Sequence, residues 1–415
     1  MPRRILAIIA PIQALLSDHP AFSDHCSLAA GPCGYPSLKN DLRCDVLIVG
    51  AGVTGALCAY QLTKAGMDVA VLDKRDVASG STSASTAMLQ YEIDTPLTDL
   101  IERMGKTDAE RAYMVCLESV GKIACLCEEI GEQCGFTWKS SVYLASKEKD
   151  VPGLQAEYAA RRAAGIELDF LSQRDIEDRF SFSRPAALHS QVAAEVDVYQ
   201  FTHRLLRRAH EMGACVFDRT AMKSHTLKRD GITVTTRAGT SVRASWVVFA
   251  TGYEVGNILK RDIVKLNSSF AFVSEPIETF TGWWEKCLLW ETARPYFYMR
   301  TTVDGRAIVG GEDAGYRDPV RRDAAIGKNA AKLEQRFREM FPGIDLEPAY
   351  AWAGTFGETK DGLAYIGSVP ELPRCFFTLG FGGNGISYSA VAAEIVRDSI
   401  QGKHNPDARL FRFDR

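Results

Sequence analysis

Three glycines and one aspartate form the part of the sequence whose residue types and spacing most directly imply chemistry. Gly50, Gly52 and Gly55 follow an apolar run, and Asp73 lies about 20 residues further on. At a strand-to-helix turn, such glycines permit a tight bend, let the backbone approach a pyrophosphate and let the helix pack closely on the sheet. An acid at Asp73 can accept hydrogen bonds from ribose hydroxyls. The segment predicts a dinucleotide-binding site made of Gly50, Ala51, Gly52, Val53, Thr54, Gly55, Asp73 and Lys74.

The neighbouring residues supply the elements that this site needs. Residues 46–49 predict a buried parallel strand, residues 56–65 a helix that ends at Gly66, and residues 69–72 a second strand. Residues 77–95 are then rich in serine and threonine. Such a segment can run along a cofactor and offer it hydroxyl and N–H groups, although an ordinary polar loop has the same composition. The cofactor contacts predicted in it are Gly80, Ser81, Thr82 and Ser83.

Composition and charge narrow the class of protein. With 415 residues, 46% of them apolar, the chain can bury a large core and should form two lobes. A net charge of −3 argues against nucleic acid or an anionic membrane as the main partner. The 11 cysteines include no Cys-x-x-Cys pair, which favours reduced thiols in the cytoplasm over a disulfide framework. The histidines lack the spacing of metal ligands, so no metal site is predicted.

The N-terminus allows two interpretations. Pro2-Arg3-Arg4 and the apolar residues 5–16 have the order of an export signal, but Pro11 and Gln13 interrupt the run and no cleavage site follows directly. We expect residues 1–41 to form an N-terminal arm packed against the body, with export or anchoring as the alternative. No later segment approaches the ~18–20 uninterrupted apolar residues of a membrane span.

The rest of the chain shows two kinds of sequence pattern, one typical of a parallel nucleotide-binding sheet and one typical of an antiparallel sheet. The sequence predicts a helix at residues 199–212, a short strand at 214–217, a hairpin at 232–243 and an apolar strand at 246–250 that ends at Thr251-Gly252. These elements indicate that the nucleotide domain is assembled from separated pieces of the chain. Residues 270–316 alternate with period two and are rich in aromatics, which predicts an antiparallel sheet. A glycine-rich turn at 380–385 then opens a final helix.

Four separated motifs together carry a resemblance to a known family. They are residues 45–74, Val247-Val-Phe-Ala-Thr-Gly252, Trp352-Ala-Gly354 with the following Asp361-Gly-Leu-Ala-Tyr-Ile-Gly367, and residues 380–386. In order and spacing the chain from about residue 42 resembles the D-amino-acid oxidase-like flavoproteins, which include glycine oxidase, sarcosine oxidase and FAD-dependent D-amino-acid dehydrogenases. The resemblance implies an α/β fold with a Rossmann-like FAD-binding domain and a substrate domain built on a mostly antiparallel sheet.

The resemblance also implies how the chain is divided and where FAD is bound. The FAD-binding domain would comprise residues 42–115, 190–264 and 350–415, and the substrate domain residues 116–189 and 265–349. The final helix would direct its positive N-terminal dipole at the flavin. Because residues 77–95 and 352–367 contain no Cys or His, we expect FAD to be non-covalent. Further FAD contacts are expected from Met222, Ala250, Thr251, Gly252, Gly382, Gly383, Asn384, Gly385 and Ile386.

For the reaction, the resemblance implies hydride transfer to flavin from the CH–NH bond of an amino acid or secondary amine, with electrons passed to oxygen or to a quinone or carrier. A substrate carboxylate would need an arginine clamp, and Arg300 is the candidate, with Tyr296 and Tyr298 on the same strand face as pocket walls. A structural role is the alternative for Arg300. Many relatives carry an arginine in the segment before Asp361, whereas this chain has none at residues 354–358.

Two other functions stay open from the sequence. One is oxidation of a 2-hydroxy acid or polyol on the same scaffold. The other is a non-catalytic subunit that binds a dinucleotide, NAD included. NAD is disfavoured because a nicotinamide domain needs neither the hydroxyl-rich segment nor the distant closing turn.

Overall fold

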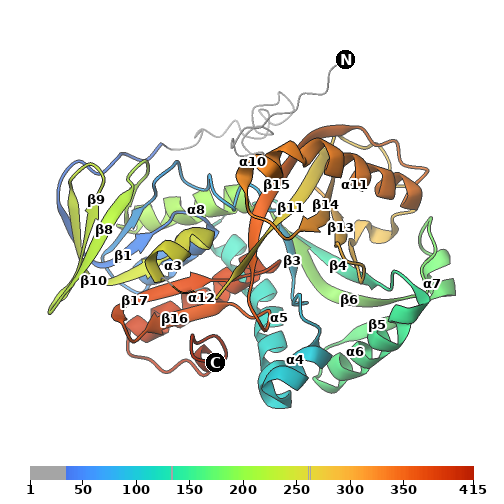
Figure 1. Ribbon diagram of the computed structural model, residues 1–415, viewed down its shortest axis with the longest axis horizontal. Helices are drawn as coiled ribbons and strands as arrows, with labels where there is room; N and C mark the ends of the chain where they lie inside the picture. The colour runs from blue at the N-terminus through green and yellow to red at the C-terminus, as the bar shows by residue number, and fades with distance from the viewer. Residues whose placement is uncertain (1–33, 132–133, 260, 262) are drawn as a thin grey trace.

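The computed structural model describes residues 34–131, 134–259, 261 and 263–415. Most of the expected N-terminal arm lies outside the described residues. The chain forms two lobes, each built around one large sheet (Figure 1). None of the described helices has the length and apolar character needed to cross a membrane.

The first sheet has a parallel centre that the apolar runs explain. Val46, Leu47 and Ile48 are fully buried, and their strand pairs in parallel with a strand on each side. A strand buried on both faces reads as a continuous apolar run, as these residues do. The order is β16 (Tyr365–Val369), β17 (Leu372–Leu379), β10 (Ser241–Phe249), β1 (Leu42–Val49), β2 (Val69–Leu72) and β7 (Cys215–Phe217), with the hairpin β8 (Met222–Lys228) and β9 (Gly231–Thr236) joined to β10.

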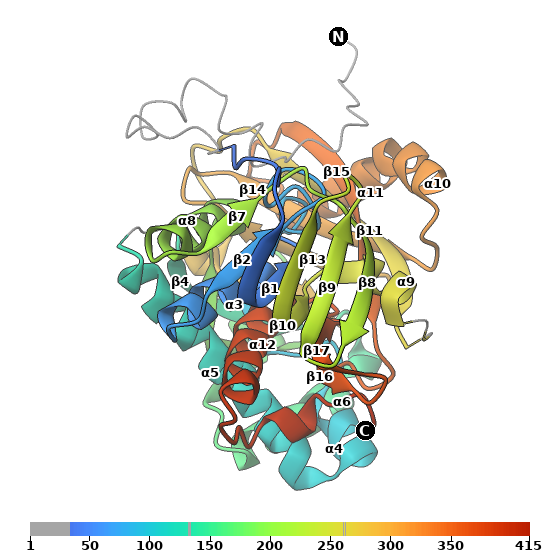
Figure 2. The same cartoon turned by 90° about the vertical axis from the view of Figure 1, so that its left-hand side faces the viewer.

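Helices cover one face of this sheet, and the β8–β9 hairpin curls toward the other (Figure 2). The Thr54 and Ser389 hydroxyls lie 2.7 Å apart and tie the helix that begins at Val53 to the one that begins at Gly385. The helices are α3 (Val53–Lys64), α5 (Lys106–Glu129), α8 (Val198–Glu211) and α12 (Gly385–Ile400).

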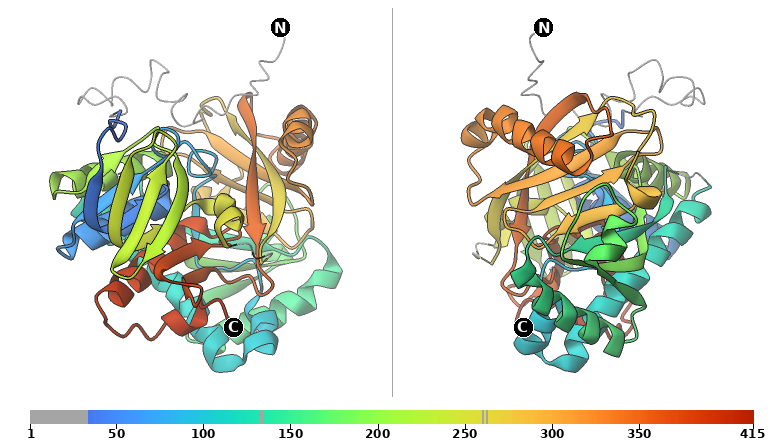
Figure 3. Two further views of the ribbon diagram at one scale, coloured as in Figure 1. Left: turned by 60° about the vertical axis from the view of Figure 1, so that its left-hand side comes forward. Right: turned by 90° about the vertical axis from the view of Figure 1, so that its right-hand side faces the viewer.

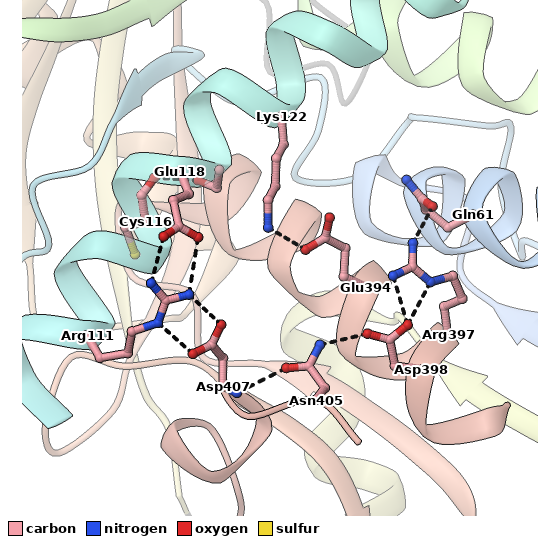
Figure 4. A network of polar contacts seen from close by, with 11 residues as sticks. Gln61, Arg111, Cys116, Glu118, Lys122, Glu394, Arg397, Asp398, Asn405 and Asp407 are labelled. Atoms are coloured by element: carbon pink, nitrogen blue, oxygen red, sulfur yellow. Dashed lines mark hydrogen bonds and ion pairs between the residues drawn. The ribbon is translucent and has the colours of Figure 1, made fainter. Parts of the chain in front are cut away.

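Ion pairs fasten α5 to α12 and to the C-terminal segment (Figure 4). Arg111 binds Glu118 on its own helix and Asp407 in the C-terminal segment, with N–O distances of 2.6 and 2.7 Å. Lys122 lies 2.6 Å from Glu394 of α12. The C-terminus is therefore attached to the lobe that carries the glycine-rich turn.

The second sheet is antiparallel apart from the pairing of β12 with β4. Its order is β15 (Pro348–Glu358), β11 (Lys265–Ser274), β14 (Ala307–Ala314), β13 (Phe297–Thr301), β12 (Leu288–Glu291), β4 (Thr137–Leu144), β6 (Ala186–Glu195) and β3 (Met88–Gln90), with β5 (Leu168–Ser172) beside β6.

Helices flank this sheet too. Leu333 and Phe337 of α11 enter the core of the sheet's outer face, which α10 and α11 cover (Figure 3). The predicted fold class, a Rossmann-like α/β domain with a second, mostly antiparallel domain, is confirmed. The helices of this lobe are α4 (Leu97–Met104), α6 (Val151–Ala163), α7 (Gln173–Glu177), α10 (Pro319–Ala324) and α11 (Ile326–Met340), and α9 (Gly256–Leu259) lies in the crossing between the lobes.

Sheet membership corrects the domain boundaries expected from the sequence. Strand β15 pairs with β11, so residues 350–358 belong to the substrate sheet and not to the FAD-binding domain. Strand β3 and the end of β6 also lie in that sheet, and α5 runs without a break through the expected boundary at residues 115 and 116. A strand's apolar pattern identifies its buried face and not the sheet that it joins, which is why these pieces were misplaced.

Candidate active site

The glycine turn between β1 and α3 has the tight geometry that the spacing predicted. Gly50 has φ +110°, and a Cβ there would collide with the Ala250 carbonyl oxygen. A Cβ on Gly55 would collide with the Gly50 carbonyl oxygen. Helix α3 begins after Gly52, which has no side chain to cap it, and apart from the Val53 N–H, which bonds to Thr82, its first N–H groups can meet an anion. This turn is a backbone cradle suited to a pyrophosphate.

Asp73 lies at the end of β2, beside the cradle. Its Oδ2 accepts a hydrogen bond from the Ala51 N–H at 2.7 Å, and its Oδ1 accepts one from the Arg75 N–H at 2.9 Å. Burial raises the pKa of Asp73, while these two backbone bonds oppose the shift. The next residue, Lys74, pairs with Glu254. The carboxylate is thus held in place next to the turn, as a ribose-binding acid must be.

One cavity of about 1440 Å³ connects this cradle with the second sheet. Small-molecule pockets usually enclose about 300–1,000 Å³, so this space can hold a dinucleotide and a substrate together. All the predicted cofactor-binding residues line the cavity except Ala51 and Gly55. Ala51 donates the hydrogen bond to Asp73, and Gly55 allows α3 to pack closely on the turn. The predicted residues that line it are Gly50, Gly52, Val53, Thr54, Asp73, Lys74, Gly80, Ser81, Thr82, Ser83, Met222, Ala250, Thr251, Gly252, Tyr296, Tyr298, Gly382, Gly383, Asn384, Gly385 and Ile386.

The hydroxyl-rich segment runs along this cavity and is anchored to both lobes. Thr82 Oγ1 accepts a hydrogen bond from the Val53 N–H at 3.0 Å, at the start of α3. From the second sheet, Trp352 Nε1 donates to the Ala84 carbonyl at 2.9 Å, and Arg300 Nε donates to the Thr86 carbonyl. The segment is therefore an ordered wall of the cavity.

The position of Arg300 corrects its expected role as a carboxylate clamp. Arg300 is 4% exposed and does not line the cavity. Its guanidinium bonds to the Thr86 and Thr301 carbonyls and lies 3.6 Å from Glu195. Arg300 shares a strand face with Tyr298, but it lies two residues further along β13, roughly 7 Å on, where the cavity has ended. These contacts agree with the alternative role of Arg300, which is to hold the structure of the cavity wall.

The closing glycine turn meets a carboxylate that the sequence did not single out. Asp94 Oδ2 accepts a hydrogen bond from the Gly383 N–H at 2.8 Å. Gly382 has φ +54°, and a Cβ there would lie 2.5 Å from Asp94 Oδ2. The Asn384 amide donates to the Glu92 carbonyl at 2.8 Å. Glycines are therefore required at this turn because Asp94 packs directly on it.

Aromatic residues wall the cavity at its substrate end. Tyr298 lies flat on Gly310 of the neighbouring strand, where a Cβ would collide with the ring. The Tyr296 hydroxyl donates to the Asp94 carbonyl oxygen at 3.4 Å, and the Arg294 guanidinium lies 3.3 Å from the Tyr296 ring centroid. Trp290 also lines the cavity and stacks on Tyr143.

Two carboxylates face these tyrosines. Burial raises the pKa of Asp313 to about 6, a shift that the Ser269 hydrogen bond opposes and the Asp94 charge strengthens. Burial also raises the pKa of Asp94 and raises the pKa of Tyr298 to about 12. At neutral pH this end of the cavity therefore presents two acids, whose ionised forms burial opposes, beside two protonated phenols.

Asp94 and Asp313 are site residues that the sequence analysis missed. Asp94 lies at the end of the hydroxyl-rich segment, two steps of period-two alternation beyond Gln90. Asp313 is the last residue but one of the strand that begins after Arg306, and it lies two residues beyond Gly310-Gly311, an unusual pair within a buried strand. These two positions in the sequence are the features from which Asp94 and Asp313 could have been recognised as site residues. In the described part of the chain, no group of three or more His, Cys, Asp or Glu residues could hold a metal ion.

The residues present fit FAD. The glycine cradle and Asp73 suit a pyrophosphate and a ribose, Met222 and the turn at Ala250 lie along the same cavity, and its far end lies between the closing turn and the second sheet. The cavity, at about 1440 Å³, is larger than a mononucleotide alone requires.

The chain also resembles known proteins over most of its length. The model of the family described as DAO, FAD dependent oxidoreductase, matches residues 45–399. Glycine oxidase of Geobacillus kaustophilus is 27% identical over 380 residues, which cover 87% of this chain and 94% of that protein. A putative Rieske 2Fe-2S iron-sulfur protein of Bacillus subtilis is 24% identical over 384 residues, covering 91% of this chain and 72% of that protein.

Solved structures share the fold. The crystal structure of Geobacillus kaustophilus glycine oxidase has a TM-score of 0.73 at 23% identity and covers 88% of this chain and 96% of its own. L-proline dehydrogenase from P. horikoshii has a TM-score of 0.73 at 20% identity, with coverage of 90% and 97%. Together with the match to the family, the dinucleotide cradle shows that the chain belongs to the DAO family of FAD-dependent oxidoreductases and that its cofactor is FAD.

Proposed function

We propose that this enzyme oxidises the CH–NH bond of an amine or amino acid by hydride transfer to flavin and passes the electrons to oxygen or to a quinone or carrier. The observation that carries the proposal is the single cavity that joins the nucleotide cradle to the wall formed by Tyr296, Tyr298, Asp94 and Asp313. In this space a substrate and the cofactor would share one enclosed volume. Relatives named for amino-acid substrates support the same class of donor.

The residues of the chain would mainly bind and orient. FAD, when bound, supplies the two-electron acceptor. The cradle at Gly50 and Asp73 would hold the nucleotide half, and the start of α12 at Gly385 would present its positive dipole to the flavin half. Tyr296 and Tyr298 would keep water away from the reacting carbon and limit the orientations of the substrate. Amine oxidation by a hydride acceptor requires no nucleophile from the protein.

FAD is proposed to be non-covalent. Within the described residues no cysteine lines the cavity, and His225, which does, lies on β8 with Met222 at the nucleotide end. Denaturing the purified protein with acid should therefore release all of the yellow colour into the supernatant. Colour that stays with the precipitated chain would contradict the proposal.

The working compartment is proposed to be the reducing cytoplasm. All nine cysteines in the described ranges are unpaired thiols. Alkylation of thiols in intact cells followed by mass measurement should find them reduced. Cysteines that escape alkylation because they form disulfides would instead indicate an oxidising compartment.

An anaerobic screen tests the reaction itself. Holoenzyme would be mixed with glycine, sarcosine, D- and L-amino acids, simple amines and 2-hydroxy acids, and bleaching of flavin absorption near ~450 nm would identify the donor. Oxygen or a quinone would then be added, and the faster reoxidation identifies the acceptor. Bleaching by hydroxy acids alone would support the alcohol alternative, and no bleaching by any donor would support a non-catalytic subunit.

The experiment compares two classes of electron acceptor because the relatives are named for different enzyme types. Their names include an oxidase, a dehydrogenase and a putative iron-sulfur protein. Slow reoxidation by oxygen with fast reoxidation by a quinone or by a one-electron carrier would place this enzyme among the dehydrogenases.

A further inference from the structure

We propose that Asp94 and Asp313 bind the positively charged nitrogen of the substrate, so that the pocket selects its donor by ammonium recognition. The inference rests on the proposed function and deepens it by naming the recognised group. It is carried by the contacts of the two carboxylates, by the surrounding cations and by the aromatic wall.

Asp313 has an unsatisfied oxygen in the cavity wall. Its Oδ1 is buried and has no hydrogen-bond partner among the described residues. The Ser269 hydroxyl hydrogen bonds to the carboxylate and lies 3.5 Å from the Tyr298 hydroxyl. A buried carboxylate oxygen without a partner is costly. Oδ1 is closed to solvent, so Asp313 would present it to a bound ammonium by rotation about its Cβ–Cγ bond.

Asp94 is fixed by the closing turn. The Gly383 N–H bonds to Oδ2, and the absence of side chains at Gly382 and Gly383 leaves room for the carboxylate. Asp94, Asp313 and Tyr296 all line the cavity, and the Tyr296 hydroxyl bonds to the Asp94 backbone carbonyl. Two acidic side chains in one cavity wall, when ionised, produce a negative potential that favours a cation.

Within the described residues, neither Asp94 nor Asp313 has a lysine or arginine within ion-pair distance, and Arg317, which lines the cavity, forms no ion pair with them. Arg294, which influences both, is exposed, stacks on Tyr296 and does not line the cavity. Arg322 lines the cavity but is held by Asp323 at 2.8 Å and by Thr355 at 3.0 Å.

The aromatic residues match the same ligand. Tyr296, Tyr298 and Trp290 line the cavity around the carboxylates, and a cation close to an aromatic face gains about 0.5–2 kcal/mol. An anionic group in this position would meet two carboxylates and the negative faces of the rings. The arrangement therefore favours the nitrogen end of a donor over a carboxylate end.

The same pair can also prepare the nitrogen for oxidation. An N–H bond of the ammonium breaks, an O–H bond forms at Oδ1 of Asp313, and the electron pair of the N–H bond remains on nitrogen as a lone pair. This transfer consumes no oxidant. The neutral amine that results has the lone pair that stabilises a developing iminium.

Three probes of similar size and different charge test the inference. Tetramethylammonium is a cation without N–H bonds, tert-butanol is neutral, and pivalate is an anion. Their binding to holoenzyme would be measured by calorimetry and by perturbation of the flavin spectrum. We expect tetramethylammonium to bind at least about tenfold more tightly than the other two. Equal affinities, or tighter binding of pivalate, would overturn the inference with no variant needed.

Isosteric variants then assign the effect. Asp94→Asn and Asp313→Asn should each remove most of the preference for the cation and leave tert-butanol binding unchanged, while Asp345→Asn, on the surface of the same lobe, should change nothing. Variants that keep the preference would overturn the assignment. Cation binding in an enzyme that bleaches only with hydroxy acids would refute the proposed function alone, and amine turnover without cation preference would refute this inference alone.

Discussion

Arg300 donates a hydrogen bond from Nε to the backbone carbonyl of Thr86, so a buried cation of the second sheet fastens the hydroxyl-rich segment of the cavity wall. The same guanidinium lies 3.6 Å from Glu195, which is 2% exposed. Burial lowers the pKa of Arg300 and the Glu195 charge opposes the shift. The residue is therefore suited to hold a backbone position, and the contact leaves no free face for a substrate.

Arg300→Met is expected to lower the free energy of unfolding by about 3 kcal/mol, because it leaves Glu195 as a buried charge supported only by Lys139. Chemical denaturation of the purified variant measures this loss. The ratio of kcat/KM between substrates with and without a carboxylate should stay as in the unchanged enzyme. A selective loss of carboxylate substrates would restore Arg300 as their clamp.

Gly55→Ala is expected to abolish FAD binding, because the added methyl group collides with the Gly50 carbonyl and displaces the cradle. Absorption near ~450 nm after purification measures the bound flavin. Gly121→Ala is the matched control, since a Cβ at this position of α5 meets nothing within 4 Å and alanine favours a helix. A yellow Gly55→Ala protein would show that the helix can move away without loss of the site.

Asp313 should make stability depend on pH. Its pKa is about 6 in the folded protein and 3.8 in its ordinary state, so the folded state binds more protons between these values. The stability that the neutral acid provides is complete below pH 3.8 and is lost as the pH rises through 6. Asp313→Asn should therefore raise the free energy of unfolding by roughly 1–3 kcal/mol at pH 7.5 and by nothing near pH 3.5. Denaturation at both pH values checks this.

The same group should shape the pH profile of the reaction. Asp313 faces Asp94, Glu358, Arg294 and the two tyrosine phenols, and a cationic donor needs the ionised carboxylate. With an amine donor, kcat/KM should fall as the pH drops through about 6. The acidic limb should be missing in Asp313→Asn. An unchanged limb would assign it to the substrate or to another acid.

Arg317 is a candidate contact for a substrate carboxylate, in addition to the recognition of the nitrogen by Asp94 and Asp313. It is exposed, lines the cavity and has no ion pair or hydrogen bond within the described ranges. Arg317→Met should raise KM about tenfold for amino acids and leave simple amines unaffected. Arg321→Met, whose guanidinium stacks on Tyr316, is the control. Equal effects on both donor classes would exclude Arg317 as a carboxylate contact.

The nucleotide half of the site was predictable because its chemistry is local. Gly50, Gly52 and Asp73 lie in one strand–turn–helix–strand unit, and backbone geometry alone determines what they can bind. The closing turn at Gly382 was predictable for the same reason. Tyr298, on β13, and Tyr296, which directly precedes that strand, both line the cavity, as the alternation led us to expect.

The substrate half depends on long-range packing, which the sequence does not record. Alternation gave the face of Arg300 but not the point where the cavity ends. Asp94 belongs to the site because the chain returns to it at Gly383, 289 residues later. Asp313 is one acid of a Glu-Asp pair, and its neighbour Glu312 turns away to Lys332. Only the fold distinguishes the two.

The hydroxyl-rich segment, held by Val53 on one side and by Trp352 on the other, makes the two lobes interdependent. The polypeptide passes back and forth between the sheets, so neither lobe corresponds to a contiguous stretch of the gene. Recombination that exchanged one lobe for another would cut the partner at several places. We therefore expect new donor preferences in such a scaffold to come from point changes along the shared wall and not from the exchange of modules.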